Sequence, residues 1–260
     1  MLILNLSVWK NIGCLYIFID IYVFLRYLTR YGKLKIERVN KDMYSLVFDT
    51  TASGVVVGLY DDDKALAMVE KNMEFGQAEE LAVSVKNVLD NAGIDFSKVG
   101  LLGVCVGPGS FTGVRASIAF ARALVMGNPD MKVTGVSAFD VYAQMFDKNA
   151  LSAYNAVIIE TKRDDFYFQL FDEKLNKITE ALALDREEII NLLKNRQTSF
   201  IGDGVDRFLA QPSGLQIKSV ELSNMISVEA LFKAVSKKNI EKKLDFPKPL
   251  YIRNADACVK

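Results

Sequence analysis

The pattern of apolar and polar positions predicts two successive groups of strands and helices. In the first group, residues 45–48, 55–60 and 64–70 form three closely spaced strands, as in an antiparallel meander. Leu81, Val85 and Val88 recur at helical spacing, which predicts a helix over 77–91 that Gly93 ends. The remaining predicted elements are a buried strand at 99–106, a loop at 107–113, a helix to about 126, a strand at 132–136 and a helix from 138 to about 146.

The second group repeats this order. Its predicted elements are strands at 156–160, 166–171 and 178–184, a helix at 185–193, strands at 200–203 and 216–220, and a helix at 227–238. Although the two halves share no visible sequence identity, three strands followed by alternating strand and helix occur in both. We therefore predict a structural duplication of two α/β lobes, an N-terminal lobe over 43–150 and a C-terminal lobe over 151–260.

Residues 1–42 differ from the rest. They hold seven Lys/Arg and three Asp/Glu, and their apolar run from Ile12 to Leu25 contains Asp20. The run is shorter than a membrane span, and a central Asp costs roughly 2.5–3.5 kcal/mol in a membrane helix. We expect an extension outside the functional domain, with Met43 as the native start. A membrane-surface anchor and an ordered addition to the fold are the alternatives.

Composition excludes several kinds of chemistry. The 260 residues contain 32 Lys+Arg, 32 Asp+Glu and no histidine. A Ser-His-Asp or Cys-His nucleophile pair, HExxH zinc chemistry and imidazole metal sites are therefore excluded. A net charge of zero provides no general attraction for nucleic acid. The three cysteines are widely spaced, which fits a reducing cytoplasm and predicts neither a disulfide framework nor a zinc site.

A glycine-rich loop between a buried strand and a helix is the strongest local signal. Such a loop presents backbone N–H groups, and the start of a helix favours an anion there. The spacing fits neither GxGxxG nor a phosphate-binding Walker loop. We predict a loop for a partner or a nucleotide, made of Gly107, Pro108, Gly109, Ser110, Phe111, Thr112, Gly113 and Arg115.

Arg115 stands near the start of the following helix, where a cation opposes the helix dipole by roughly 0.3–1 kcal/mol. A bound anion, a carboxylate from a partner or simple solvation would each account for it. The same helix is rich in alanine. Its small residues suit packing on the parent sheet or a helix–helix interface between subunits.

A second candidate site follows the first predicted strand. Asp49, Thr50 and Thr51 supply a carboxylate and two hydroxyls, which could face a nucleotide phosphate and its Mg²⁺. The same residues are also ordinary in turns.

Several motifs together resemble the TsaB (YeaZ) family. They are Asp49-Thr50-Thr51, the loop GPGSFTGVR over 107–115, GVS over 135–137, ETKRDDFY over 160–167, GDG over 202–204 and PLYIRNADA over 249–257. The resemblance spans about residues 43 to 257. Glu160 departs from it, because Asp is commoner at that position.

This resemblance implies a duplicated actin-like ATPase (ASKHA) fold, with a mixed sheet and flanking helices in each lobe. It implies a non-catalytic scaffold subunit that binds and supports TsaD, the transferase that makes threonylcarbamoyladenosine beside the anticodon of tRNAs reading A-starting codons. TsaD-type proteins hold a metal through paired histidines, which this chain lacks. The resemblance therefore implies no catalytic or metal-binding residue here.

It also implies the partners. A TsaE-like ATPase joins the complex, tRNA is contacted indirectly through it, and no membrane is involved. The expected dimer surface is the loop helix with the 77–91 helix, including Gln77, Glu79 and Glu80. The chain alone could form a homodimer. It requires no cofactor of its own, while ATP or ADP could lie at the interface of the complex. The alternatives are a stand-alone ATP-dependent kinase of the same fold and, much less favoured, a glycoprotease.

Overall fold

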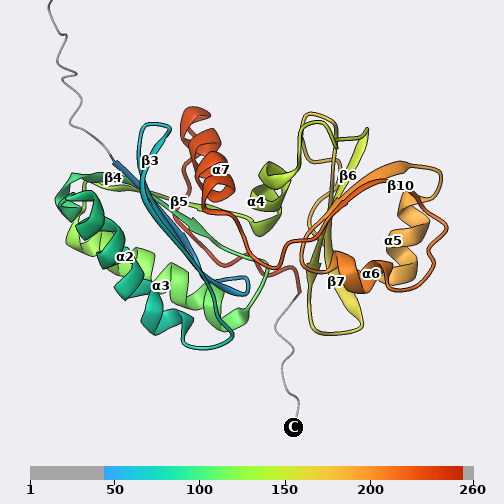
Figure 1. The fold of residues 1–260 in the computed structure, drawn as a ribbon, viewed down its shortest axis with the longest axis horizontal. Coiled ribbons are helices and arrows are strands. Elements are labelled where there is room, and N and C mark those ends of the chain that lie inside the picture. Colours follow the sequence, from blue (N-terminus) through green and yellow to red (C-terminus); the bar gives the residue numbers. More distant parts are fainter. Residues whose placement is uncertain (1–43, 254–260) are drawn as a thin grey trace, which may run out of the picture. The chain divides into compact units, whose positions relative to one another are not determined.

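The computed structural model describes residues 44–253 (Figure 1). The extension predicted over 1–42 and the start predicted at Met43 lie outside the described residues. Within the described range, the chain forms two five-stranded sheets in succession, each with parallel and antiparallel pairs and each with helices packed on it.

The first sheet has its most buried strands at its centre. Its strands are β1 (Tyr44–Asp49), β2 (Gly54–Asp61), β3 (Lys64–Asn72), β4 (Val99–Cys105) and β5 (Lys132–Val136), in the order β3-β2-β1-β4-β5. β1, β2 and β3 form the predicted antiparallel meander, whereas β4 and β5 continue the sheet in parallel. Every residue of β4 is buried, as its uninterrupted apolar run predicts.

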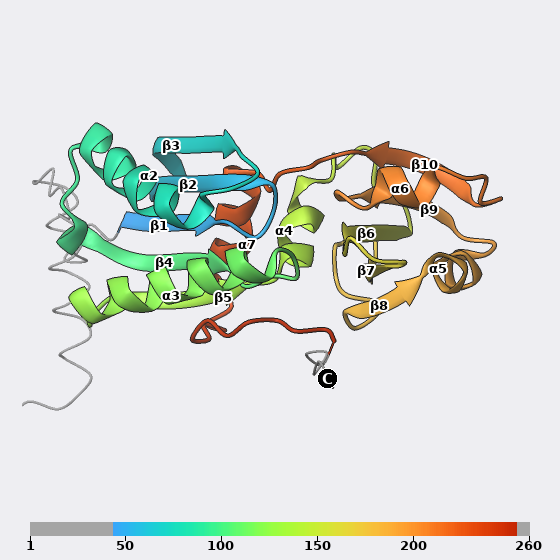
Figure 2. The same ribbon diagram turned by 90° about the horizontal axis from the view of Figure 1, so that it is seen from below.

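Helices cover both faces of this sheet. α2 (Gln77–Ala92) and α3 (Phe111–Gly127) lie side by side on one face, and α7 (Val228–Ile240) lies on the other (Figures 1 and 2). The predicted apolar positions of α2 are buried against the sheet. A short 3-10 helix, η2 (Phe96–Lys98), precedes β4, and α4 (Ala138–Met145) follows β5.

The second sheet repeats the topology of the first. Its strands are β6 (Tyr154–Glu160), β7 (Asp165–Phe171), β8 (Leu182–Asp185), β9 (Gln197–Ile201) and β10 (Gln216–Glu221), in the order β10-β9-β6-β7-β8. Again an antiparallel meander is followed by two parallel strands. The predicted duplication is confirmed, because each half holds a mixed five-stranded sheet of the same topology with flanking helices.

Three elements of the second half differ from the sequence prediction. β8 begins at Leu182 instead of 178, and β9 begins at Gln197 instead of 200. Polar residues hide the start of β9 in the sequence. Thr198 and Ser199 are buried there, and their hydroxyls donate to the carbonyl oxygens of Arg196 and Ala150. The five-residue helix α6 (Val205–Leu209) was not predicted. The helix predicted over 185–193 is α5 (Arg186–Leu193), which begins with a capping box formed by Asp185 and Glu188.

The end of the chain returns to the first sheet. α7 packs against β1, β2, β4 and β5, although the prediction places residues 151–260 in the C-terminal lobe. The segment after α7 also joins the first half, because Gly135 donates to the carbonyl oxygen of Asp245 (3.3 Å) and Leu250 to that of Val106 (2.9 Å). One hydrophobic cluster contains Val47 of β1, Val157 of β6 and residues of α4 and α7. Burial of the apolar side of α7 therefore fixes its place.

Candidate functional site

The glycine-rich loop connects β4 to α3, as the sequence predicts. Ser110 is the N-cap of α3, and its hydroxyl oxygen accepts a hydrogen bond from the N–H of Gly113 at 3.2 Å. The Gly107–Pro108 peptide bond is cis. Phe111, Thr112 and Arg115 are exposed, while Gly107, Pro108 and Gly113 are buried. The loop therefore presents one surface to solvent and packs the other inside the fold.

That inner surface packs on the turn that follows β1. The Ser110 N–H donates to the carbonyl oxygen of Thr51 at 2.8 Å. A Cβ at Gly109 would lie 2.4 Å from the same oxygen, and a Cβ at Gly113 would lie 1.8 Å from the carbonyl oxygen of Thr50. Both glycines thus permit a backbone approach that no other residue would allow. The two predicted candidate sites lie against each other.

The side chains of Asp49, Thr50 and Thr51 form hydrogen bonds inside the protein. The Thr50 hydroxyl donates to the carbonyl oxygen of Gly113 at 2.8 Å and lies 2.8 Å from the Ser117 hydroxyl. The Thr51 hydroxyl donates to the sulfur of Cys105 at 3.4 Å. The Asp49 carboxylate accepts from the N–H groups of Thr51 (2.8 Å) and Ala52 (3.4 Å), as in an Asx-turn.

This arrangement does not fit the phosphate turn expected from the sequence. Asp49, Thr50 and Thr51 are 2%, 0% and 3% exposed, so a phosphate would have to displace buried contacts to reach them. Burial also raises the pKa of Asp49, which opposes the charged carboxylate that would bind Mg²⁺. The physical reason for the difference is that α3 packs its first turn onto these residues. The turn acts as an internal brace for the loop.

A second glycine loop makes the equivalent contact in the other half. Gly202, Asp203 and Gly204 follow β9, as Gly107–Gly113 follows β4. A Cβ at Gly202 would lie 2.2 Å from the carbonyl oxygen of Ile158 in β6. The Asp203 carboxylate accepts from the N–H of Glu160 at 2.9 Å. In both halves, therefore, a glycine loop packs closely on neighbouring backbone, which is the turn after β1 in the first half and β6 in the second.

Buried acids from both halves influence one phenol. Burial raises the pKa of Asp203 to about 6. Tyr142 of α4 is 1% exposed, and within the described residues its hydroxyl has no hydrogen-bond partner. Burial first, then the charges of Asp203 and Asp49, raise the pKa of Tyr142. Protonated carboxyls are favoured in this region because water is largely excluded from it.

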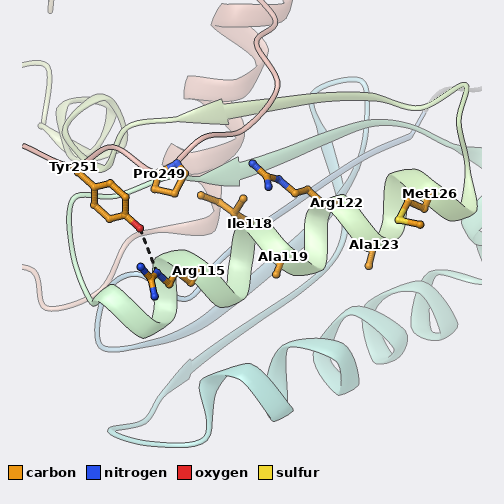
Figure 3. Close-up of a pocket in the computed structure, with 8 residues that line it drawn as sticks. All are labelled: Arg115, Ile118, Ala119, Arg122, Ala123, Met126, Pro249 and Tyr251. Atoms are coloured by element: carbon orange, nitrogen blue, oxygen red, sulfur yellow. Dashed lines mark hydrogen bonds between the residues drawn. The ribbon is translucent and has the colours of Figure 1, made fainter. Parts of the chain in front are cut away.

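Arg115 contacts aromatic groups. Its guanidinium carbon lies 3.7 Å from the ring centre of Phe111. Its Nε donates to the Tyr251 hydroxyl at 3.3 Å, and Figure 3 shows this hydrogen bond as a dashed line. The ring face of Phe111 attracts the cation, which offsets the unfavourable helix dipole. Sequence reasoning missed Tyr251 as part of this site, because 136 positions separate it from Arg115. The PLYIRNADA motif was the available signal.

A groove runs along the exposed side of α3. Figure 3 shows the side chains that line it, and its volume is about 500 Å³. It is lined by Arg115, Ile118, Ala119, Arg122, Ala123, Met126, Pro249 and Tyr251. Two guanidiniums and a phenol thus border an otherwise apolar surface made by α3 and the C-terminal segment. Such a groove suits an amphipathic partner.

Of the three residues predicted on α2, two form hydrogen bonds within the protein and one is exposed. The Gln77 amide donates to the carbonyl oxygens of Met73 (3.0 Å) and Glu74 (3.1 Å). Glu80 accepts from the Lys71 ammonium at 2.6 Å and the Ser84 hydroxyl at 2.7 Å, and these bonds lower its pKa. Glu79 is exposed. Because α2 contacts α3, their solvent-facing sides form one surface, here called the helix-pair surface.

The described residues hold neither a cluster of metal ligands nor a membrane-spanning helix. No group of three or more Cys, Asp or Glu side chains in residues 44–253 is placed to hold a metal ion. In the same part of the chain, no helix combines the length and the hydropathy needed to cross a membrane.

Comparisons with known proteins agree with these features. A family model described as TsaD, tRNA N6-adenosine threonylcarbamoyltransferase, matches residues 76–204. The tRNA threonylcarbamoyladenosine biosynthesis protein TsaB of Escherichia coli (strain K12) is 25% identical over 232 residues, covering 84% of this chain and 98% of that protein. TsaB of Buchnera aphidicola subsp. Baizongia pistaciae is 25% identical over 171 residues, covering 63% of this chain and 76% of that protein.

Solved structures share the fold. YeaZ from Pseudomonas aeruginosa superposes with a TM-score of 0.69 at 21% identity, covering 80% of this chain and 99% of that chain. Another structure, described as an uncharacterized protein with similarity to peptidase YEAZ from Pseudomonas aeruginosa, gives a TM-score of 0.71 at 21% identity, covering 81% of this chain and 100% of that chain. The architecture of both lobes is therefore shared with YeaZ.

Proposed function

The chain belongs to the TsaB (YeaZ) family, and from this we propose that it acts in the biosynthesis of threonylcarbamoyladenosine in tRNA. Its role in this proposal is to bind and support a TsaD-like transferase. TsaD transfers threonylcarbamoyl from its adenylate to the adenosine beside the anticodon, and this chain supplies a binding surface.

The observation that carries the proposal is the helix-pair surface. Eight of the exposed side chains on or beside α2 and α3 are small or apolar, as in a surface that packs against another protein. They are Phe75, Ala78, Ala82, Val83, Phe111, Ala119, Ala123 and Met126. Phe75 and Met126 are both 83% exposed. Exposure of large apolar side chains beside alanines favours helix-to-helix docking with a partner.

The amino-acid composition favours a scaffold role over a catalytic role. The chain contains no histidine, so it has no counterpart of the paired histidines that hold the metal of TsaD-type proteins. In the proposed complex, metal and substrate belong to the partner. A TsaE-like ATPase joins this complex, tRNA reaches the chain through it, and ATP or ADP binds at its interface.

Reconstitution tests the proposal. The chain and the TsaD-like protein of the same cell should co-elute, and tRNA modification should fall when the chain is omitted. Ala123→Trp places a large ring on the exposed side of α3 and should abolish co-elution. Ala210→Trp, at an exposed alanine after α6, is the matched control and should co-elute as wild type does. Failure of the wild-type pair to associate, with modification unchanged by omission, would reject the proposal.

Nucleotide titration separates this proposal from the stand-alone kinase. A kinase of this fold requires phosphate and Mg²⁺ to reach a turn like Asp49–Thr51, which is buried here. We expect no heat of binding when ATP and Mg²⁺ are titrated into the isolated chain by calorimetry. Micromolar affinity that Asp49→Ala removes would instead favour the kinase.

A further inference from the structure

The exposed side of α3 carries a regular line of four residues. Arg115, Ala119, Arg122 and Met126 follow one another at intervals of four, three and four, which places them on one side of the helix. All four are exposed and all four line the groove (Figure 3). This is the spacing with which one helix meets another in a packed pair. It alternates cations with small or flexible apolar side chains.

The two cations on this line are not matched by acids of the chain. Arg115 contacts Phe111 and Tyr251, while Arg122 donates to the Pro247 carbonyl oxygen at 3.2 Å and lies 5.5 Å from the ring centre of Phe246. Within residues 44–253, neither guanidinium forms an ion pair. α3 itself contains no Asp or Glu. Each guanidinium keeps N–H donors for an incoming acceptor, because Arg has five.

The spacing of these cations defines what they can recognise. Seven residues of α-helix span about 10.5 Å, or two turns. A helix lying along α3 would present carboxylates at the same interval if it carried acids seven residues apart. Between the cations, Ala119 leaves room for the backbone of such a helix to approach closely.

We propose that this groove binds an amphipathic helix of the transferase partner, with two carboxylates about two turns apart pairing with Arg115 and Arg122. Small or apolar residues between those carboxylates pack on Ala119, Ala123 and Met126. The proposal rests on the function proposed above and adds the chemistry of the partner's recognition helix. Arg and carboxylate groups form strong paired hydrogen bonds, so these contacts set which partner binds and in which register.

A second copy of this chain fits the groove less well. A symmetric pairing of two α3 helices would bring arginine against arginine, and no acid of α3 would compensate them. Two of the three acids of α2 already form ion pairs, Glu80 with Lys71 and Asp90 with Lys86. Only Glu79 of this helix would then be available to an arginine of a second copy. The charges therefore favour a different protein over self-association on this side.

Charge reversal tests the inference. The affinity of the full chain for its TsaD-like partner is measured by interferometry for wild type, Arg115→Glu and Arg122→Glu, at low and raised salt. Each variant should weaken binding by about tenfold or more, because a like charge then faces a carboxylate. Lys148→Glu, at an exposed position before β6, is the charge-matched control and should bind as wild type does. Arg122→Gln should bind more tightly than Arg122→Glu and show a smaller dependence on salt.

Crosslinking identifies the occupant. A photoreactive residue at position 123, beside the proposed carboxylate contacts, should crosslink to a partner helix that holds two acids seven residues apart. Replacing those two acids with lysine should restore binding to the double variant Arg115→Glu, Arg122→Glu. Circular dichroism and thermal melting of each variant show that it is folded.

The outcomes distinguish the two proposals. If the wild-type chain does not bind the transferase, the proposed function fails. If wild type binds and both charge-reversed variants bind equally well, the function stands and this inference is overturned. Crosslinking to a second copy of the chain, or to a partner segment without acids, also overturns it.

Discussion

Replacing Gly113 with alanine should destabilise the protein, against the usual effect of this substitution in a helix. An unhindered Gly→Ala change in a helix gains roughly 0.5–1 kcal/mol, because alanine has the higher helix propensity. At Gly113, however, the new Cβ would lie 1.8 Å from the carbonyl oxygen of Thr50. That oxygen belongs to a fully buried turn, so it cannot rotate away as a flexible side chain would.

The magnitude follows from what must move. Forcing an extra carbon into a packed interior costs about 1–3 kcal/mol, occasionally more. Separating α3 from the turn would also stretch the bond from the Thr50 hydroxyl to the Gly113 carbonyl, now 2.8 Å, worth about 1 kcal/mol. After the propensity gain is subtracted, we expect Gly113→Ala to lose about 1–3 kcal/mol of unfolding free energy.

The same helix supplies a matched control. Gly127 is the last residue of α3, and a Cβ there would meet nothing within 4 Å. Gly127→Ala should therefore leave stability unchanged or raise it by up to about 1 kcal/mol. Urea unfolding of wild type and both variants, with the slope compared between them, measures the difference. Equal midpoints for Gly113→Ala and Gly127→Ala would refute the reasoning that a close backbone contact decides the outcome.

Three further predictions concern buried polar groups. Asp203 has a pKa of about 6 against 3.8 unfolded, so folding favours its neutral form and the wild type loses stability as pH rises through 6. As pH rises from 4 to 7.5, the unfolding free energy of Asp203→Asn should increase relative to that of wild type by up to about 3 kcal/mol, measured by urea unfolding. A difference that stays constant across this range would contradict the prediction. Thr50→Val removes both buried hydroxyl contacts and should cost about 1–3 kcal/mol in thermal unfolding, whereas Thr50→Ser keeps the hydroxyl and should lose less; a loss in Thr50→Ser as large as in Thr50→Val would contradict the importance given to the hydroxyl. Cys105 is buried and its thiol pKa is raised by burial, so in a Cys14→Ser, Cys258→Ser variant it should react with a thiol reagent only after unfolding; fast reaction in buffer would show that the site opens.

Local patterns in the sequence determined most of the elements. The helical spacing of Leu81, Val85 and Val88 depends only on which side of the helix is apolar. Ser110 and Asp185 cap the helices that follow them, and each cap accepts a hydrogen bond from a backbone N–H only three residues away. The family resemblance was likewise carried by short motifs and was confirmed.

The sequence predictions were wrong where distant contacts bury polar residues or where a helix is very short. β9 begins with Gln197 and Thr198, whose sequence predicts a turn as readily as a strand. Their strand conformation depends on neighbours in β6 and β10, which satisfy the backbone groups. The helix α6 has only five residues, too few for a helical period to be visible.

The sequence by itself determined the order of the elements, the duplication and the candidate loop, because each rests on residues close together along the chain. Tertiary structure alone decided what those candidates do. It packed Asp49–Thr51 beneath the glycine loop, placed Tyr251 beside Arg115 and returned α7 to the first sheet. These contacts join positions that are 60 or more residues apart. Apolar burial drives such contacts without direction, so only the folded chain shows which surfaces are covered and which stay open to a partner.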